Sequence, residues 1–382
     1  MRDVTWGTVC MNAQRLCIAL LIIACSTPAG AADRLVIYPA VQPGGVVLSV
    51  ASSTDSEAIA PLLEDYLQDK PTVGIRYHEL KAEQIYVDVV AGRLRADTPD
   101  LLISSAMDLQ TKLVNDGYAL PHPIAKDVAN AMPAWARWRS EIYGFSYEPI
   151  VLVYNTRLLK ADQVPRTHKA LLDMLLDPAQ PLQGRIGTYD PAASSFGYLL
   201  ATQDARLGDL SRALITALGI NHAVLANETR ALLDQMAIGR LALGYNLLGS
   251  YAFARIAQGA PLAIMPFDDY TLGITRTVLI PKTATHPGEA ARFVDYLLSP
   301  RGQRVLIERT GFLPIRNDIP LPSIAKAYKA EHGTKMRPIP LGPGLLVYRD
   351  RWKEQDFMKD WRQAFENGPA PRPPEPSPTN VR

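Results

Sequence analysis

The sequence has little cysteine, and its only three cysteines, Cys10, Cys17 and Cys25, lie near the N-terminus. A chain that loses its first 32 residues would have no thiol, which excludes disulfide bonds, a cysteine nucleophile and a thiolate metal site. The 40 Lys and Arg nearly balance the 38 Asp and Glu, and no basic run with interleaved aromatics indicates nucleic-acid binding. No G-x-S-x-G, H-E-x-x-H or P-loop motif occurs, so the common hydrolase and nucleotide-binding patterns are missing.

The N-terminus has the pattern of a leader. Arg2 and Arg15 precede an apolar run at residues 16–24, which is too short to span a bilayer. Small residues at 29–32 suit cleavage, so residues 1–32 are predicted to be a signal peptide and the protein periplasmic. An alternative stays open, because residues 22–25 resemble a lipobox and would leave a lipid anchor at Cys25. No later segment reaches the length of a membrane span.

One stretch organises the rest of the chain. Residues 46–51 predict a buried strand, residues 52–55 are small and polar, and Ile59, Leu62 and Tyr66 then recur at helical spacing. Thr54 and Glu57 stand at the spacing of a capping box. A polar loop that enters a helix presents free N–H groups, which suit an anion. The same loop read alone is equally a capped strand–helix turn.

The same pattern of a buried strand, small polar residues and a helix occurs again further along the chain. Residues 100–103 predict a second buried strand, which ends in Ser104 and Ser105 before another helix. The alternation of strands and helices predicts a parallel sheet with crossover helices. A further α/β set follows residues 150–154, and 382 residues are more than one core usually holds, so two lobes are expected. Residues 150–154 and 273–280 are extended and suit the two crossings between lobes.

Several stretches then resemble the extracellular solute-binding proteins of ABC importers, in the branch of ferric-iron, phosphoglycerate and sugar-phosphate binders. The resemblance covers roughly residues 45–365 and is carried by residues 53–64, 99–109, 115–118, 143–155, 297–303 and 311–314. It implies an α/β fold of the type II periplasmic binding proteins, with two mostly parallel sheets flanked by helices and joined by two hinge strands. Residues 45–145 and 268–365 would form the first lobe, residues 150–266 the second, and residues 368–382 a proline-rich disordered tail.

Ligands of open α/β sheets bind beyond the carboxyl ends of the strands, and the resemblance implies the same loops. The candidate ligand-binding residues are Ser53, Thr54, Asp55, Ser104, Ser105, Tyr147, Tyr189, Ser194, Ser195, Tyr245, Asn246, Tyr270 and Arg276. Hydroxyls and helix N-termini favour a small organic anion with a carboxylate or phosphate group. Taken singly, each serine is more often a helix cap than a ligand contact, and hinge packing is the other interpretation of the tyrosines. Arg276 is either a counter-charge or an ion-pair partner, and Glu148 is expected to hold the hinge.

Ferric iron is the alternative ligand. The family's ferric binders use two adjacent tyrosines at the position of Tyr245 and Asn246, and only one is present here. We expect no metal and no cofactor, because the six histidines also lack ligand spacing. An enzyme is not expected, since Ser104 or Ser194 would need a histidine base that no candidate loop carries. The expected partners of this monomer are a small anionic solute and an ABC permease in the inner membrane, or alternatively a sensor histidine kinase.

Overall fold

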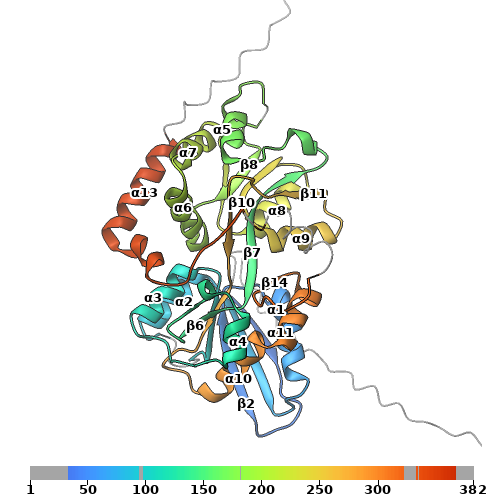
Figure 1. Cartoon of the computed structure of the whole chain (residues 1–382), viewed down its shortest axis with the longest axis vertical. Helices are drawn as coiled ribbons and strands as arrows, with labels where there is room; N and C mark the ends of the chain where they lie inside the picture. The colour runs from blue at the N-terminus through green and yellow to red at the C-terminus, as the bar shows by residue number, and fades with distance from the viewer. Residues whose placement is uncertain (1–32, 94–97, 181, 322–332, 334, 367–382) are drawn as a thin grey trace, which may run out of the picture.

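The chain folds into two α/β lobes that strand β7 connects (Figure 1). The computed structural model describes residues 33–93, 98–180, 182–321, 333 and 335–366. The predicted signal peptide and the predicted proline-rich tail lie outside the described residues. Within the described part, no helix is both long enough and apolar enough to cross a bilayer.

The first lobe is built on a seven-stranded mixed sheet. Strand β2 pairs in parallel with β3 and β4, and the strands beyond them pair antiparallel. The sheet order is β1 (Asp33–Tyr38), β3 (Val73–Leu80), β2 (Val46–Ser52), β4 (Leu101–Ser104), β13 (Thr277–Leu279), β6 (Ile142–Gly144) and β5 (Arg137–Trp138). Its helices are α1 (Ser56–Leu67), α2 (Ala82–Val90), α3 (Met107–Asn115), α4 (Lys126–Ala131), η1 (Ala134–Ala136), α10 (Pro287–Leu298), α11 (Pro300–Val305) and η3 (Leu306–Thr310).

The second lobe is also built on a mixed sheet, in which β10, β8 and β9 are parallel. Its order is β15 (Met336–Pro338), β12 (Thr271–Ile274), β7 (Ser146–Asn155), β10 (Leu243–Leu248), β8 (Ile186–Tyr189) and β9 (Val224–Ala226), while β11 (Leu262–Met265) and β14 (Leu313–Pro314) also pair with β7. Its helices are η2 (Ala161–Gln163), α5 (His168–Leu176), α6 (Ser195–Leu207), α7 (Ser211–Ile220), α8 (Thr229–Ala237) and α9 (Gly249–Ala257). The predicted α/β architecture with two lobes is confirmed, but both sheets are mixed rather than mostly parallel, since β7 and β13 pair antiparallel with their neighbours.

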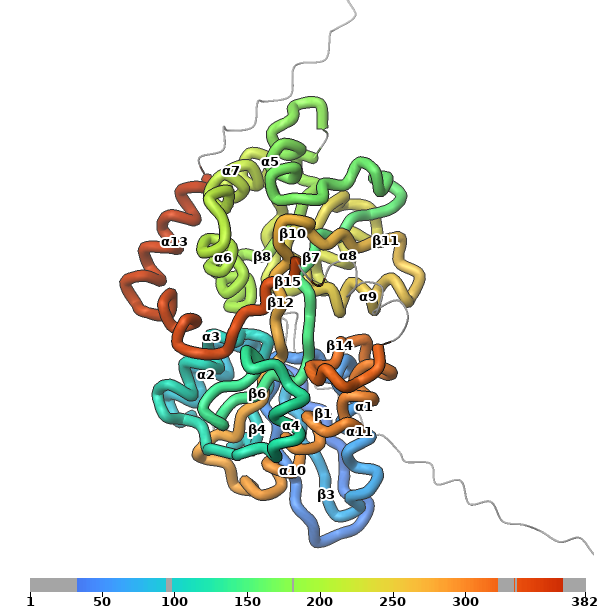
Figure 2. The backbone as a smooth tube through the Cα atoms, in the orientation of Figure 1, coloured from blue at the N-terminus to red at the C-terminus, as the bar shows by residue number. Residues whose placement is uncertain are grey.

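Two crossings lie side by side between the lobes (Figure 2). The first runs from β6 into β7, and the second runs from β12 into β13. Phe145 N–H donates to the carbonyl of Arg276 over 2.9 Å, which ties the crossings together. A side chain at Gly144 would place its Cβ 2.2 Å from Thr275 Oγ1, so only glycine permits this close approach. The second crossing lies within the predicted residues 273–280, whereas the first lies at Phe145, before the predicted residues 150–154, which pair inside the second sheet.

The C-terminal part departs from the predicted lobe boundaries. The prediction placed residues 268–365 in the first lobe, but β12 and β15 join the second sheet, and helix α13 (Arg351–Glu366) packs on α7 (Figure 2). The contact is close, since a Cβ at Gly219 would lie 1.8 Å from the Phe365 carbonyl oxygen. Of the predicted range, β13, α10, α11 and η3 do belong to the first lobe, and η4 (Pro343–Arg349) packs against α3 of that lobe. Amphipathic spacing shows that α13 has an apolar face, but it does not identify the surface that covers this face.

The first lobe also begins earlier than predicted. Strand β1 starts at Asp33 and pairs with β3, whereas the prediction began the lobe at residue 45. The two lobes are in contact in this structure, because α2 and α3 of the first lobe touch α6 of the second. One cluster of buried apolar residues continues across this contact and includes Ile85, Met107 and Leu199.

Candidate ligand site between the lobes

The first lobe contributes a pair of serines at one edge of its sheet. Strands β2 and β4 are parallel neighbours, so their carboxyl ends meet, and Ser53 Oγ lies 2.9 Å from Ser104 Oγ. Ser104 Oγ also accepts from the backbone N–H of Ala106, and Ser105 beside it is buried. The sequence analysis predicted these residues from different loops, and the structure brings Ser53 and Ser104 into direct contact.

Thr54 and Asp55 follow Ser53 at this edge, and their side chains contact different parts of the protein. The predicted capping box at Thr54 does not form, because α1 has Asp55 at its N-cap position and Thr54 Oγ1 accepts from Arg276 instead. Thr54 is fully buried, and its carbonyl accepts from the Tyr77 hydroxyl over 2.6 Å. Asp55 points toward the second lobe, where its carboxylate lies 3.2 Å from Arg230 on α8.

The second lobe meets α2 of the first lobe at the N-terminus of α6. Ser194 is the N-cap, and its hydroxyl accepts from the backbone N–H of Gly197 over 3.1 Å. The backbone N–H of Ser195 donates to the carboxylate of Glu83, which lies on α2 of the first lobe. The Ser195 hydroxyl is buried and has no hydrogen-bond partner among the described residues. A helix N-terminus favours negative charge, so Glu83 occupies a position that suits an anion.

Tyr189 lies at the end of β8, where the loop that leads into α6 begins. It is buried, contacts the apolar cluster that crosses the lobes, and makes a short hydrogen bond with the Thr229 hydroxyl. Burial raises the pKa of the Tyr189 hydroxyl. The loop fits closely around it, because a Cβ at Gly197 would lie 2.5 Å from the Tyr189 Cβ. The site therefore combines hydroxyl and N–H donors with carboxylates from the opposite lobe.

Arg276 lies at the hinge, inside a network that both lobes share. Its Nε lies 2.9 Å from Glu148 Oε1, its Nη2 donates to Oε2 over 3.3 Å, and its Nη1 donates to Thr54 Oγ1 over 2.7 Å. Ser146 and Ser250 also donate to Glu148, one from β7 and the other from α9. All three nitrogens of the Arg276 side chain are thus engaged within the protein. Of the two roles predicted for Arg276, the structure shows the ion pair, and Glu148 holds the hinge as expected.

Tyr245, Asn246 and Tyr270 gather elsewhere, in the interior of the second lobe. The Tyr245 hydroxyl donates to Asp204 over 2.9 Å and the Tyr270 hydroxyl donates over 3.1 Å, while the Asn246 amide donates to the same carboxylate. Burial is the main cause that raises the pKa of Asp204 above its usual range. Tyr270 also stacks on His168, with ring centroids 4.0 Å apart. These residues form one hydrogen-bonded group around Asp204 rather than a single shell with the serines.

Tyr147 is separate from both groups. Side chains alternate along a strand, so Tyr147 points away from Glu148 and packs against Trp135, with ring centroids 5.6 Å apart. Burial raises its pKa to about 12. The candidate residues therefore divide into the interlobe edge, the hinge, the Asp204 group and this packed tyrosine.

Sequence reasoning missed Glu83, Arg230 and Asp204. Asp204 left a signal, because it stands four residues after Leu200 on the buried face of a helix, where a lone carboxylate needs partners. Glu83 and Arg230 lie in the first turns of their helices and look like ordinary surface charges. Within the described residues, no group of three or more His, Cys, Asp and Glu side chains could hold a metal ion.

Two α/β lobes with hydroxyl and N–H donors where they meet, and with crossing strands tied by a buried ion pair, have the architecture of a two-lobed binding protein. The model of the bacterial extracellular solute-binding proteins matches residues 84–334. The chain belongs to this family and is the solute-binding component of an ABC transporter. No curated protein sequence matches it.

Solved structures agree with this assignment. A substrate-binding protein of an ABC transporter from Agrobacterium tumefaciens is 31% identical, with 88% of this chain and 100% of that one covered and a TM-score of 0.80. Iron-bound HitA from Pseudomonas aeruginosa is 16% identical, with 84% and 99% covered and a TM-score of 0.65. AfuA from Actinobacillus pleuropneumoniae, with fructose-6-phosphate bound, is 17% identical, with 84% and 98% covered and a TM-score of 0.66. The last two likenesses show the fold alone.

Proposed function

We propose that this protein captures a small organic anion between its lobes and delivers it, unchanged, to an ABC permease of the inner membrane. The observation that carries this proposal is the N-terminus of α6. There, a carboxylate of the opposite lobe accepts from Ser195 N–H, while the buried Ser195 hydroxyl has no partner among the described residues. A carboxylate or phosphate of a ligand would accept from the same donors.

The hydroxyls of the first lobe complete this site. Ser53 and Ser104 already share one hydrogen bond, and each hydroxyl can both donate and accept, so a ligand can be bound by rotating them. The anion would displace Glu83 from α6 and take its place between the lobes. The closed form is favoured only by the ligand's differential affinity for it, so the ligand must bind better than Glu83 does.

The residues favour an organic anion over ferric iron. An iron site would need an ionised Tyr245, but burial raises the pKa of Tyr245 well above its usual range and its hydroxyl donates to Asp204. Asn246 supplies no phenolate at the adjacent position. HitA contains iron and AfuA contains fructose-6-phosphate, so relatives of this fold accommodate both kinds of ligand. The α6 donors of this chain suit the phosphorylated or carboxylated kind.

The protein would act in the periplasm as a monomer, after removal of residues 1–32 or with a lipid anchor at Cys25. A sensor histidine kinase would be the alternative receiver of the closed form. No reaction on the ligand is proposed, since Ser104 contacts Ser53 and Ser194 caps α6.

A thermal-shift screen of residues 33–382 tests the proposal, with phosphorylated and carboxylated metabolites beside ferric salts and neutral sugars. A ligand at 100 times its dissociation constant adds about 2.7 kcal/mol of apparent stability. Ser195→Ala should then weaken a binding anion by about 1–3 kcal/mol. Ser194→Ala is the matched neighbour, expected to lower the stability of α6 with a smaller effect on affinity. A response to ferric iron alone would overturn the proposal.

A further inference from the structure

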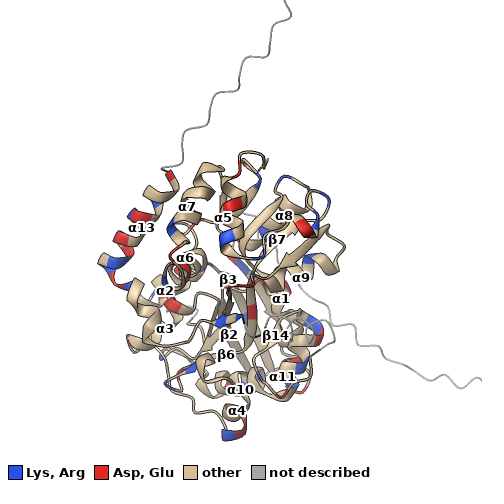
Figure 3. Cartoon of the chain, turned by 45° about the horizontal axis from the view of Figure 1, so that its top comes forward, with Lys and Arg blue, Asp and Glu red and all other residues tan. Residues whose placement is uncertain are grey.

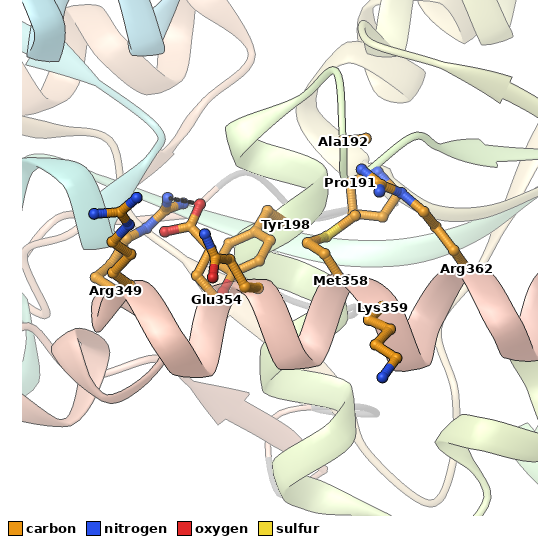
Figure 4. Close-up of a pocket in the computed structure, with 10 residues that line it drawn as sticks. Pro191, Ala192, Tyr198, Arg349, Glu354, Met358, Lys359 and Arg362 are labelled. Carbon is orange, nitrogen blue, oxygen red and sulfur yellow. Dashed lines mark hydrogen bonds and ion pairs between the residues drawn. The ribbon is translucent and has the colours of Figure 1, made fainter.

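A cavity of about 630 Å³ lies beneath helix α13, against α6 and the loop that precedes it (Figure 4). None of the candidate ligand residues of the interlobe cleft lines it. Its walls come from Pro191 in the loop, Tyr198 on α6, Arg349 at the end of η4 and one face of α13. The cavity therefore shares a loop with the cleft site but opens on the other side of it.

The cavity wall is cationic. Four Lys and Arg side chains line it, whereas Glu354 is its single carboxylate. Acidic and basic residues alternate along α13 (Figure 3), yet Asp356, Asp360 and Glu366 do not line the cavity. In Figure 4, Arg362 extends toward Pro191 and Ala192, while Lys359 points away from them. Arg362 on α13 and Arg349 on η4 thus give this space a cationic wall, which favours an anionic occupant.

Arg349 is the buried member of this wall. Its side chain is 10% exposed, its Nε lies 2.7 Å from Asp108 on α3, and its Nη1 donates to Glu354 over 3.3 Å. The guanidinium lies 4.4 Å from the centroid of the Tyr198 ring. Nη2 is buried and has no hydrogen-bond partner among the described residues. A buried donor without an acceptor is costly, and an acid group in the cavity would satisfy it if the guanidinium turned toward that group.

We propose that this cavity is a second binding site, for a small organic molecule that carries two acid groups. One acid group would bind Arg349 and the other would bind Arg362, while Met358 and Tyr198 contact the carbon chain between them. Arg349 already contacts Asp108 of the first lobe and Tyr198 of the second. A ligand here would therefore stabilise the closed arrangement from a position outside the cleft.

Calorimetric titration of residues 33–382 with succinate, a dicarboxylate probe, tests the inference, and inorganic phosphate serves as the compact probe. Arg362→Gln should weaken succinate at the cavity about tenfold, because a charged hydrogen bond is lost. Lys353→Gln is the matched control, since it removes a cation from the same helix outside the cavity wall. Both side chains are exposed, so both variants are expected to fold.

The cleft and the cavity are distinguished by Ser195→Ala. Succinate binding that Arg362→Gln weakens and Ser195→Ala leaves unchanged supports the cavity site. Binding that only Ser195→Ala weakens overturns the cavity site and leaves the cleft proposal standing. Equal effects of Arg362→Gln and Lys353→Gln would show a nonspecific charge effect and would also overturn the cavity site. Phosphate that binds in the cavity as tightly as succinate would overturn the proposal of a ligand with two acid groups. No succinate binding at all overturns the inference for dicarboxylates.

Discussion

Charged groups link the lobes at the hinge and at the edge where Asp55 and Glu83 meet the second lobe, and these two places differ in their access to water. At the hinge, the side chains of Arg276 and Glu148 are 1% and 0% exposed. At the cleft, Asp55 and Arg230 are 26% and 49% exposed, and Glu83 meets Ser195 at a half-buried position. Both places bring a carboxylate to a positive group, but only the hinge removes the pair from water.

This difference separates a permanent junction from an exchangeable one. A buried pair with further hydrogen bonds is strongly destabilised when one partner is lost, because a charge is left without compensation. An exposed pair contributes little, since water and salt screen it and compete for both partners. We therefore expect the lobes to rotate about the hinge while the contacts of Asp55 with Arg230 and of Glu83 with Ser195 break.

Glu148→Ala is expected to have the largest effect of the changes considered. It leaves the buried guanidinium of Arg276 uncompensated and removes the acceptor of Ser146 and Ser250, which should cost about 3–5 kcal/mol of unfolding free energy. Urea unfolding monitored by tryptophan fluorescence measures the loss. Asp173→Ala is the control, because it breaks an exposed ion pair with Lys169 and should change stability little.

The double variant Glu148→Leu with Arg276→Met tests whether the loss of stability comes from an uncompensated charge. Apolar residues of similar volume often replace a buried ion pair at little cost, so most of the loss should be recovered. If the double variant is as unstable as Glu148→Ala, the hydrogen bonds to Ser146, Ser250 and Thr54 stabilise the hinge more than the ion pair does.

Glu83→Gln should have a smaller effect, on the balance between open and closed forms. Loss of a negative charge at a helix N-terminus costs about 0.3–1 kcal/mol, so the ligand-free protein should open more often. Small-angle X-ray scattering without ligand should then report a larger radius of gyration. An anionic ligand should bind up to about fivefold more tightly, because it no longer displaces a carboxylate from α6.

Glu64→Gln is the control for this prediction, since Glu64 is exposed and pairs with Arg309 inside the first lobe. Weaker ligand binding by Glu83→Gln would contradict the competition and place Glu83 among the groups that bind the ligand.

The sequence predicted the hinge strands and the serine edge because both depend on local patterns. Apolar residues at 150–154 and the polar ends of two buried strands are visible without a structure. The pairing of Ser53 with Ser104 then follows from parallel strands, whose carboxyl ends meet at one edge. The two-lobed fold was predictable for the same reason, with support from the resemblance to a family.

The remaining parts depend on contacts between distant segments, which no local pattern specifies. Thr54 stood at the spacing of a helix cap, but its hydroxyl instead accepts a hydrogen bond from Arg276, which is more than two hundred residues later in the chain. Tyr245 and Asn246 were expected just after a strand, yet both lie within β10, where they donate hydrogen bonds to Asp204 on α6 in the interior of the second lobe. Helix α13 is a further example, because its apolar face packs on α7 of the second lobe and not, as predicted from the sequence, on the first lobe.

Arg230→Ala is expected to have the smallest effect. Arg230 lies 3.2 Å from Asp55 across the cleft, but half of its side chain is exposed, so the pair should contribute less than about 1 kcal/mol. The effect on closure should appear in low salt and vanish near 1 M salt, where the Debye length falls to about 3 Å. Scattering measured at both salt concentrations tests this, with Arg240→Ala as an exposed control away from Asp55. An effect that persists in high salt would mean that Arg230 is desolvated in the closed form, and the contrast between hinge and cleft would then be smaller than the exposed fractions indicate.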